Sequence, residues 1–410
     1  MHIKVEVATK LIVRNMKAIF TFSLLLIACT FFLAEQAEAQ GCVAVRDMSC
    51  SGGAAAISGN AAGLLNKGEF MALLGYRHFK SFRHFRGKHE EPHRVAEGTE
   101  VINYFNSFDL GLSYSLTNRI AITAVLPITF NDRSSMYEHY GNSVEANPDR
   151  RRFDTNSSGI GDLRVSVSYW MLNPAKYSKG NFALGLGVKP PTGNYSVEGD
   201  FHRRDSLGND FTTRRPVDQS IQLGDGGWGV TLEAQGFHSI VHNLSMFFTA
   251  FYMSNPREHN GILRNPSADK TNKHNYFSVA DQYAARVGFN YAPLPNLGVS
   301  AGGRIEGIPS EDLIGGKKGF RRPGYALSLE PGVTLIHKQA TFNLNVPVAI
   351  FRNRVQSVQD KELTASTGNY RIGDAAFADF VVNATVAYRF GGQHKMAPES
   401  GLFKDVPAPK

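Results

Sequence analysis

From residue 68 almost to its end, the chain repeats one unit: a segment of alternating apolar and polar residues, followed by a polar connection. A period of two is that of a β-strand with one apolar and one polar face. A tilted strand needs about 9–11 residues to cross a bilayer, and each of these segments is long enough. The predicted strands are residues 68–80, 99–116, 120–131, 159–172, 181–193, 226–240, 244–254, 280–291, 297–308, 324–335, 340–351 and 377–390.

The connections alternate between short and long. The short ones are 117–119, 173–180, 241–243, 292–296 and 336–339. The long ones are 81–98, 132–158, 194–225, 255–279, 309–323 and 352–376. Up-and-down strands require this alternation when both ends of the chain lie on one side of a membrane. Because lipid offers no hydrogen-bond partner to a strand edge, such strands must close. We expect an all-β fold, a transmembrane antiparallel up-and-down β-barrel of about twelve strands over residues 67–390.

The two faces of the predicted strands separate cleanly. In 340–351, Phe342, Leu344 and Ile350 alternate with Thr341 and Asn343. We assign the apolar set to lipid and the polar set to the lumen. After the N-terminal region no stretch is apolar for 18 residues, so helical spans are not predicted. The net charge of +8 is spread along the chain without a basic stripe of interleaved aromatics, which argues against nucleic-acid binding.

The N-terminal region has the features of a secretory signal peptide. An apolar run follows Lys17, and Ala37-Glu38-Ala39 offers a cleavage site, so residues 1–39 are the predicted signal peptide, with Met16 as an alternative start. Cys29 follows a lipobox-like Leu26-Ile27-Ala28, so lipidation of Cys29 is the competing interpretation.

Two short segments flank the predicted barrel. Residues 40–66 carry Cys42 and Cys50, which we expect to form a disulfide in an oxidising compartment. The rest of 40–66 is rich in small residues and is either a plug in the lumen or a periplasmic lead-in. The tail 391–410 is predicted to be periplasmic. We therefore expect an integral protein of the bacterial outer membrane with both termini in the periplasm.

The predicted lumen face carries five acidic and five basic residues. A balanced set indicates either a salt-bridged interior or the two walls of a small porin constriction. The residues are Asp109, Asp162, Arg164, Lys189, Glu233, Arg286, Arg304, Glu306, Glu330 and Arg389. Strand 244–254 differs, because Phe247, Phe251 and Met253 point inward. Apolar lumen residues suit either an apolar ligand or packing against the N-terminal segment.

Prolines recur inside the predicted strands, where each removes a hydrogen-bond donor from the ladder. The sites are Pro127, Pro190, Pro191, Pro331 and Pro347. They predict local bulges or kinks, or strands that end just above the membrane.

The long loops contain basic pairs such as Arg214-Arg215 and Arg321-Arg322. These suit contact with lipopolysaccharide phosphates, or attraction of anionic substrates. The histidines near the first long loop fit no zinc signature, and no local Ser-His-Asn signature stands out. We predict no enzyme activity, no cofactor and no metal. The expected partners are membrane lipid, lipopolysaccharide, the barrel-assembly machinery and a small hydrophobic ligand.

Several motifs resemble those of known outer-membrane transporters. Asn60-Ala61-Ala62-Gly63-Leu64 resembles the Asn-Pro-Ala-Gly-Leu motif of the long-chain fatty-acid outer-membrane transporter family, with Ala61 in place of proline. Gly159-Ile160-Gly161-Asp162-Leu163, Lys189-Pro190-Pro191-Thr192-Gly193 and Asp225-Gly226-Gly227-Trp228-Gly229 resemble the related group associated with the meta-pathway of phenol degradation.

The resemblance implies a barrel plugged by its N-terminal segment. It also implies that a kinked strand opens the wall sideways and that small hydrophobic or aromatic compounds pass the outer membrane. We therefore predict a channel for passive uptake of such compounds. The alternatives are a barrel that only displays its loops, and a narrow general porin.

Overall fold

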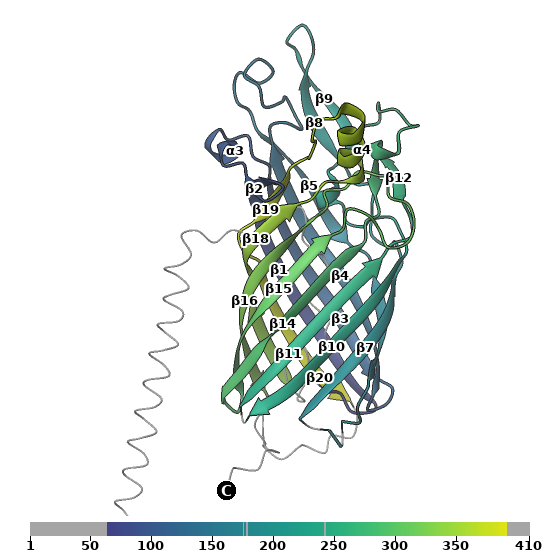
Figure 1. The fold of residues 1–410 in the computed structure, drawn as a ribbon, viewed down its shortest axis with the longest axis vertical. Helices are drawn as coiled ribbons and strands as arrows, with labels where there is room; N and C mark the ends of the chain where they lie inside the picture. The colour runs from purple at the N-terminus through teal and green to yellow at the C-terminus, as the bar shows by residue number, and fades with distance from the viewer. Residues whose placement is uncertain (1–63, 175, 178, 242, 392–410) are drawn as a thin grey trace, which may run out of the picture. The chain divides into compact units, whose positions relative to one another are not determined.

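Twelve strand positions close into one antiparallel barrel in the computed structural model, which describes residues 64–391 apart from 175, 178 and 242 (Figure 1). We call each position a stave; it consists of one strand, or of two strands separated by a short interruption. Nine staves are single strands: β1 (Glu69–Arg86), β3 (Ile102–Ser115), β4 (Ile120–Ser135), β7 (Gly180–Lys189), β10 (Gly229–Val241), β11 (Leu244–Ser254), β14 (Gln282–Leu294), β15 (Leu297–Ile308) and β16 (Gly324–His337). Three are interrupted: β5 (Phe153–Ile160) with β6 (Arg164–Trp170), β17 (Ala340–Asn345) with β18 (Val348–Arg354), and β19 (Ala375–Ala378) with β20 (Val382–Gly391).

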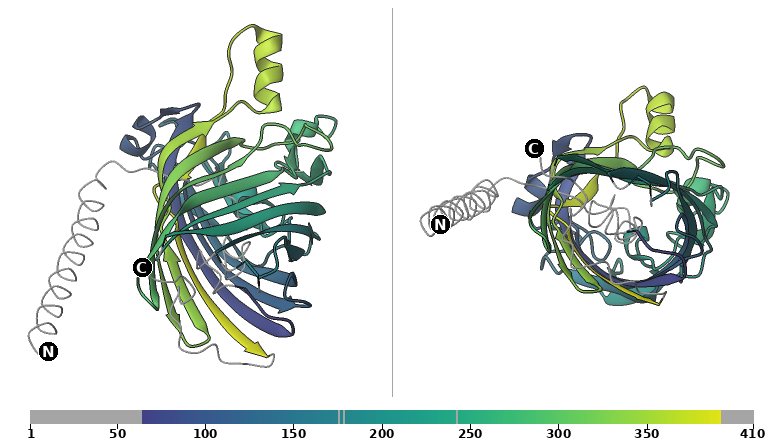
Figure 2. Two further views of the ribbon diagram at one scale, coloured as in Figure 1. Left: turned by 60° about the horizontal axis from the view of Figure 1, so that its bottom comes forward. Right: turned by 90° about the horizontal axis from the view of Figure 1, so that it is seen from below.

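Sequence neighbours pair around the ring, and pairing of β1 with β20 joins the first stave to the last. Seen along its axis, the barrel is a continuous ring of strands (Figure 2). The predicted fold class is confirmed. The pairing between the first and last strands brings two aromatic rings together. Phe70 of β1 lies opposite Phe390 of β20, and their rings stack with centres 5.4 Å apart.

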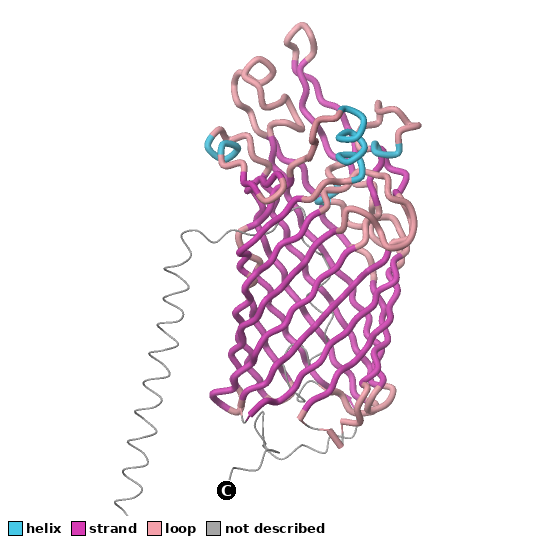
Figure 3. The backbone as a smooth tube through the Cα atoms, viewed as in Figure 1, coloured by secondary structure: helices cyan, strands magenta, loops and turns pink. Residues whose placement is uncertain are grey.

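All long connections lie at one end of the barrel, hereafter the loop end, and the short ones lie at the other, the turn end (Figure 3). Several loops contain elements that the sequence pattern did not predict. These are β2 (His89–Glu90), α3 (His93–Ala96), β8 (Glu198–Arg204), β9 (Asp210–Pro216), η3 (Gln219–Ile221), β12 (His259–Leu263), η4 (Lys273–Asn275), β13 (Tyr276–Ser278) and α4 (Val358–Thr367). Within the described part of the chain, none of the helices is long and apolar enough to span a membrane.

The two faces of the barrel strands differ as predicted. On β7, Leu184, Leu186 and Val188 point outward, and Leu186 is 58% exposed to the surroundings. Lys189 points inward and is 1% exposed. An apolar outer face and a polar inner face are what a wall between lipid and an internal lumen requires.

The prolines coincide with the interruptions of the staves. Residues 161–163, between β5 and β6, lie beside Pro127, whose carbonyl accepts a 2.8 Å hydrogen bond from the Gly161 N–H. Val346, between β17 and β18, donates to Pro331 at 3.0 Å, and Val381, between β19 and β20, donates to Pro347 at 3.0 Å. Because proline supplies no N–H, the ladder is irregular on that side. β4 and β16 themselves continue through Pro127 and Pro331, whereas Pro347 lies between β17 and β18.

Some predicted boundaries are wrong. β7 ends at Lys189, so the expected strand 181–193 is too long, and Pro190 and Pro191 follow the strand. Conversely, β1 extends to Arg86, β4 extends to Ser135, and β5 begins at Phe153 inside the expected loop 132–158. These extensions lie at the loop end, where polar residues occupy both faces and the alternation on which the prediction depended is lost.

Candidate functional site

The lumen is crossed by a cluster of paired charges. Arg77 on β1 and Glu306 on β15 form a 3.1 Å ion pair, although β20, β17 and β16 lie between their strands in the ring. The Arg304 Nε–H donates to Glu306 at 2.8 Å, and Arg286 pairs with Glu330 at 2.8 Å. Burial of charges requires such pairing. Four of the predicted lumen charges and Arg77, which the prediction did not include, therefore form one network.

The other predicted lumen charges have further neighbours, and the charge of Asp109 also acts on Arg77 of this network. The Ser107 hydroxyl donates to buried Asp109 at 2.7 Å, and Ser166 contacts Glu233 at 3.5 Å. The Arg164 guanidinium lies 5.3 Å from the centre of the Phe251 ring. Arg389 is half-buried on β20.

A second group of charges lies where the β5–β6 stave is interrupted. Lys189, at the end of β7, pairs with Asp162 at 3.6 Å and forms a shorter ion pair with Asp225. Asp162 also accepts the backbone N–H of Gly193 at 2.9 Å and that of Asp225 at 3.1 Å. We call Asp162, Lys189 and Asp225 the wall cluster. It joins three chain segments that are distant in sequence.

Glycines allow these three segments to approach closely. A Cβ on Gly193 would lie 2.9 Å from the Gly161 carbonyl carbon, and one on Gly224 would lie 2.7 Å from the Gly193 carbonyl oxygen. Real Cβ atoms do not come this close to backbone, so larger residues would force the segments apart. The three glycine-rich motifs thus meet at one point of the wall.

An internal cavity of about 110 Å³ lies next to the wall cluster. Its apolar lining includes Phe79, Phe105, Leu223, Met253, Phe277 and Ile308, and Asp162 and Lys189 form part of its polar side. Phe79 and Phe105 stack with ring centres 4.8 Å apart. The rest of the lining is largely polar and includes Gln222, Asp225, Gln282, Arg321 and Arg322. Apolar and polar groups thus both face this space, and a small-molecule site needs both.

The three predicted ligand-lining residues are all buried in the lumen. Met253 lines the cavity, and Phe251 packs against Met253 and Ala284. Phe247 lies nearer the turn end, where the Arg286 guanidinium is 5.2 Å from its ring centre. The structure therefore brings one of the three to the cavity and places a second directly behind it.

The loop after β9 covers the cavity at the loop end. Val217, Ile221 and Leu223 are buried, although they belong to a connection expected to be polar and exposed. The Gln219 amide donates to the Ser278 carbonyl at 2.7 Å, which ties this loop to the one before β14. The sequence signal for this burial, four apolar residues among charged ones at 211–223, is too weak to distinguish from an exposed loop.

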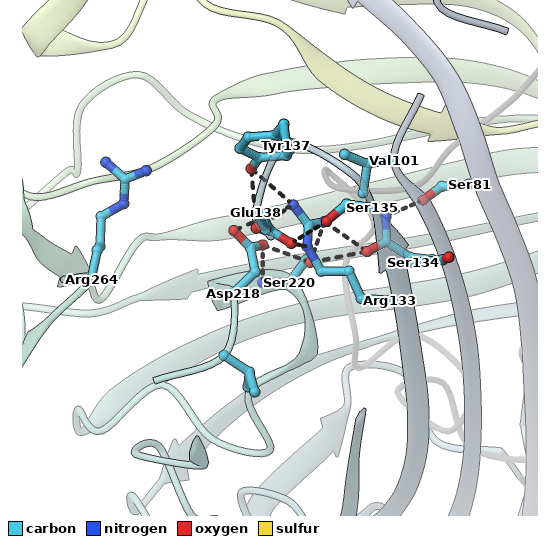
Figure 4. Close-up of polar contacts among 12 residues, drawn as sticks. Ser81, Val101, Arg133, Ser134, Ser135, Tyr137, Glu138, Asp218, Ser220 and Arg264 are labelled. Atoms are coloured by element: carbon cyan, nitrogen blue, oxygen red, sulfur yellow. Dashed lines mark hydrogen bonds and ion pairs between the residues drawn. The ribbon is translucent and has the colours of Figure 1, made fainter. Parts of the chain in front are cut away.

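An ion network that the sequence pattern did not predict holds this covering loop (Figure 4). Arg133 pairs with Glu138 at 2.8 Å, and Arg322 binds both oxygens of Asp218 at 2.8 and 2.7 Å. Burial alone would raise the pKa of Asp218, but the charges of Arg133 and Arg322 outweigh it and hold this pKa well below its ordinary value. Burial, together with the charge of Glu138, raises the pKa of Tyr137 to about 12.

At the turn end, the described chain begins with two inward-packed leucines. Leu64, the last residue of the predicted plug motif, packs against Trp170, Ala183 and Phe237. Leu65 packs against a cluster that includes Met71 and Leu73. The predicted signal peptide, the candidate disulfide Cys42–Cys50, Asn60 to Gly63 and the tail 392–410 lie outside the described residues.

One cluster in the described part of the chain has the composition of a metal site. Ligand atoms of His84, Glu91 and Asp374 lie within 4.8 Å of one another. However, Arg94 already pairs with Asp374 at 2.8 Å and with Glu91 at 3.5 Å. The Val101 N–H donates to His84 Nε2, so the imidazole uses its other nitrogen toward Asp374. A guanidinium among the acids disfavours a cation, and the arrangement fits a structural ion pair.

Comparison with known proteins shows similarity at the level of the fold. No protein-family model matches the chain, and no curated protein matches it. Among solved structures, an outer-membrane channel from Pseudomonas putida F1 is 16% identical, covers 81% of this chain and 98% of its own, and has a TM-score of 0.51. A monoaromatic hydrocarbon channel, CymD, is 11% identical with a TM-score of 0.42 over 86% of this chain and 96% of its own. The P. putida toluene transporter TodX is 12% identical with a TM-score of 0.38 over 88% of this chain and all of its own.

Proposed function

We propose that the protein is an outer-membrane channel that takes up small hydrophobic or aromatic compounds without chemical change. A closed barrel with an apolar outer face fits a bilayer, and the loop end would face outward with the turn end in the periplasm. The fold shared with the P. putida F1 outer-membrane channel and the motif resemblance support the same assignment.

The cavity beside Met253 is the observation that carries this proposal. Its volume of about 110 Å³ compares with the roughly 150 Å³ of an apolar cavity known to hold benzene. Because this volume is the smaller of the two, it limits a bound compound to a single ring or a short chain. A general porin is less well supported, because the Arg77–Glu306 network occupies the lumen with side chains that are almost fully buried.

The wall cluster supports a sideways route out of the cavity. Asp162 and Lys189 border the cavity and also sit where the β5–β6 stave is interrupted beside Pro127. Parting Lys189 from Asp162 and Asp225 would separate β7 from the broken stave at this level. We propose that a bound compound leaves toward the membrane at this point.

We further propose that residues 40–66 plug the turn end of the lumen. The packing of Leu64 and Leu65 supports this, because both leucines lie against side chains of the barrel interior at the turn end. Deleting residues 40–66 should raise single-channel conductance in planar bilayers, and unchanged conductance would show that these residues do not plug the lumen.

Two partners are also proposed. The exposed arginines of the loops would contact lipopolysaccharide phosphates, and the barrel-assembly machinery would insert the protein into the membrane.

Filling the cavity tests the proposal. Ala280 is a buried lining residue, so Ala280→Phe should occupy much of the 110 Å³ and reduce toluene uptake by reconstituted vesicles at least fivefold. Ser267→Phe adds the same ring at an exposed loop position and should leave uptake unchanged. Equal uptake by both variants, with both barrels folded, would show that the compound does not pass through this cavity.

A further inference from the structure

A second cavity, of about 430 Å³, lies at the loop end and has a strongly basic lining. Its walls come from β1, α3, β4, the loops that follow β4 and β12, the loop before β16, α4 with its flanking segments, and β19. The charged and titratable lining residues are His84, Arg94, Arg133, Tyr137, Arg264, Arg321, Arg322, Arg354, Asp360 and Asp374. The volume is within the usual range for a small-ligand pocket.

Five of these six arginines already have a carboxylate partner. The pairs are Arg94–Asp374 at 2.8 Å, Arg133–Glu138 at 2.8 Å, Arg321–Asp312 at 2.6 Å, Arg322–Asp218 at 2.7 Å and Arg354–Asp360 at 3.2 Å. Arg264 is different. Over residues 64–391 its guanidinium has no ion pair and no hydrogen bond, and it stacks on Phe320 with its central carbon 3.3 Å from the ring centre. Figure 4 shows it across from Tyr137 and Asp218, outside their hydrogen-bond network.

The surroundings of Arg264 make its charge costly. Arg322 lies over the same Phe320 ring, at 4.8 Å, and an Arg215 N–H donates to the Arg264 backbone carbonyl at 3.3 Å. Burial, and next the positive charge of Arg322, lower the pKa of Arg264 to about 10, and the negative charges of Asp218 and Glu138 offset this lowering only in part. The side chain is still cationic at pH 7. A half-buried cation beside another cation, facing a cavity of ligand size, is an arrangement that a bound anion would stabilise.

We propose that this loop-end cavity binds small organic anions, with Arg264 receiving the ligand's carboxylate. A guanidinium offers two parallel N–H donors that match the two oxygens of a carboxylate. Phe320 holds the guanidinium plane by stacking, which reduces the conformational freedom lost on binding. Because residues of several loops and strands wall the cavity, a free small molecule fits it better than a phosphate of lipopolysaccharide, which would approach along the outer side of the barrel.

Direct binding to the purified full-length protein in detergent tests this inference. Isothermal titration with benzoate, at low salt, should give saturable binding that weakens as sodium chloride is added, because salt screens charge pairs. Toluene, which lacks the carboxylate, should not compete for this site. Arg264→Gln should weaken benzoate binding at least about tenfold, the effect of losing a charged hydrogen bond. Arg264→Lys, which keeps the charge but not the fork, should lose less.

Arg214→Gln is the matched control, since Arg214 is an exposed arginine of the same end of the barrel and does not line the cavity. Retained heat-modifiable migration in gel electrophoresis shows that each variant barrel is folded. Undiminished benzoate binding by Arg264→Gln would overturn the inference. So would displacement of benzoate by purified lipopolysaccharide at stoichiometric amounts, which would assign the oxyanion to lipid phosphate. The result does not depend on the uptake proposal, because it is measured without transport.

Discussion

Removal of the Glu306 carboxylate should destabilise the barrel strongly. Glu306 lies between Arg77 and Arg304, which are 0% and 4% exposed, and it is itself 0% exposed. Glu306→Gln keeps the size of the side chain but leaves Arg77 without the carboxylate with which it pairs at 3.1 Å. Arg304 keeps Glu330 at 3.5 Å, so only part of the network is lost.

The expected magnitude follows from the burial of this pair. Breaking a buried ion pair by removing one partner costs about 3–5 kcal/mol, since the remaining charge is left uncompensated. Because Arg304 retains a partner, we expect the lower end, about 3 kcal/mol. With a denaturant dependence of roughly 1–3 kcal/mol per molar urea, the unfolding midpoint should fall by about 1–3 M.

Urea unfolding from lipid vesicles, followed by tryptophan fluorescence, measures this change. Glu198→Gln is the control, because Glu198 and Arg214 form a pair at 3.4 Å whose side chains are 47% and 64% exposed. Such an exposed pair contributes less than about 1 kcal/mol. Arg77→Met combined with Glu306→Gln should cost less than the sum of the single changes, since the two residues interact. A loss below about 1 kcal/mol for Glu306→Gln would mean that water solvates the cluster and that the lumen is open to solvent at this level.

Two further predictions concern the wall and the covering loop. Gly193→Ala should push apart the segments at the wall cluster, lower the free energy of unfolding by about 1–3 kcal/mol and increase leakage of a small sugar from vesicles that contain the protein. Gly303→Ala is the control and should do neither, because an added Cβ there meets nothing within 4 Å. Asp218 has a lowered pKa, so its contribution to stability is present above its ordinary pKa of about 3.9 and is lost as pH falls below that value. Asp218→Asn should therefore lower the thermal unfolding midpoint at pH 7. Between pH 5 and 2 the midpoint of this variant should fall less than that of the wild type, and equal falls would show that Asp218 does not contribute to stability through its charge.

The barrel could be predicted from sequence because lipid contact imposes a period of two on every stave. Strand 244–254 was predicted to the residue, since its outer face is apolar from Leu244 to Tyr252 and its ends carry polar turns. The interruptions beside Pro127, Pro331 and Pro347 have a different cause, since proline cannot donate to the ladder. Strand ends at the loop end were not, because Arg133 and Ser135 lie above the band where the outer face must be apolar.

The candidate sites were predictable only in part. Asp162 and Lys189 were predicted as lumen residues because they lie on the polar faces of predicted strands. Asp162, Lys189 and Asp225 each belong to one of the three glycine-rich motifs, and these motifs meet at one point of the wall. The residues that cover the cavity and line the basic pocket, such as Asp218 and Arg264, come from loops. Their neighbours are set by tertiary contacts between loops distant in sequence, and no local periodicity reports such contacts.

Uptake by intact cells tests the central claim most directly. Cells with and without the protein would be given labelled toluene, a labelled short aliphatic acid and labelled arabinose, and initial uptake rates would be compared. The account predicts that removal of the protein selectively lowers uptake of the hydrophobic compound and leaves arabinose uptake unchanged. An equal loss for arabinose would assign the barrel to the general porins, and unchanged uptake of all three would contradict a channel function.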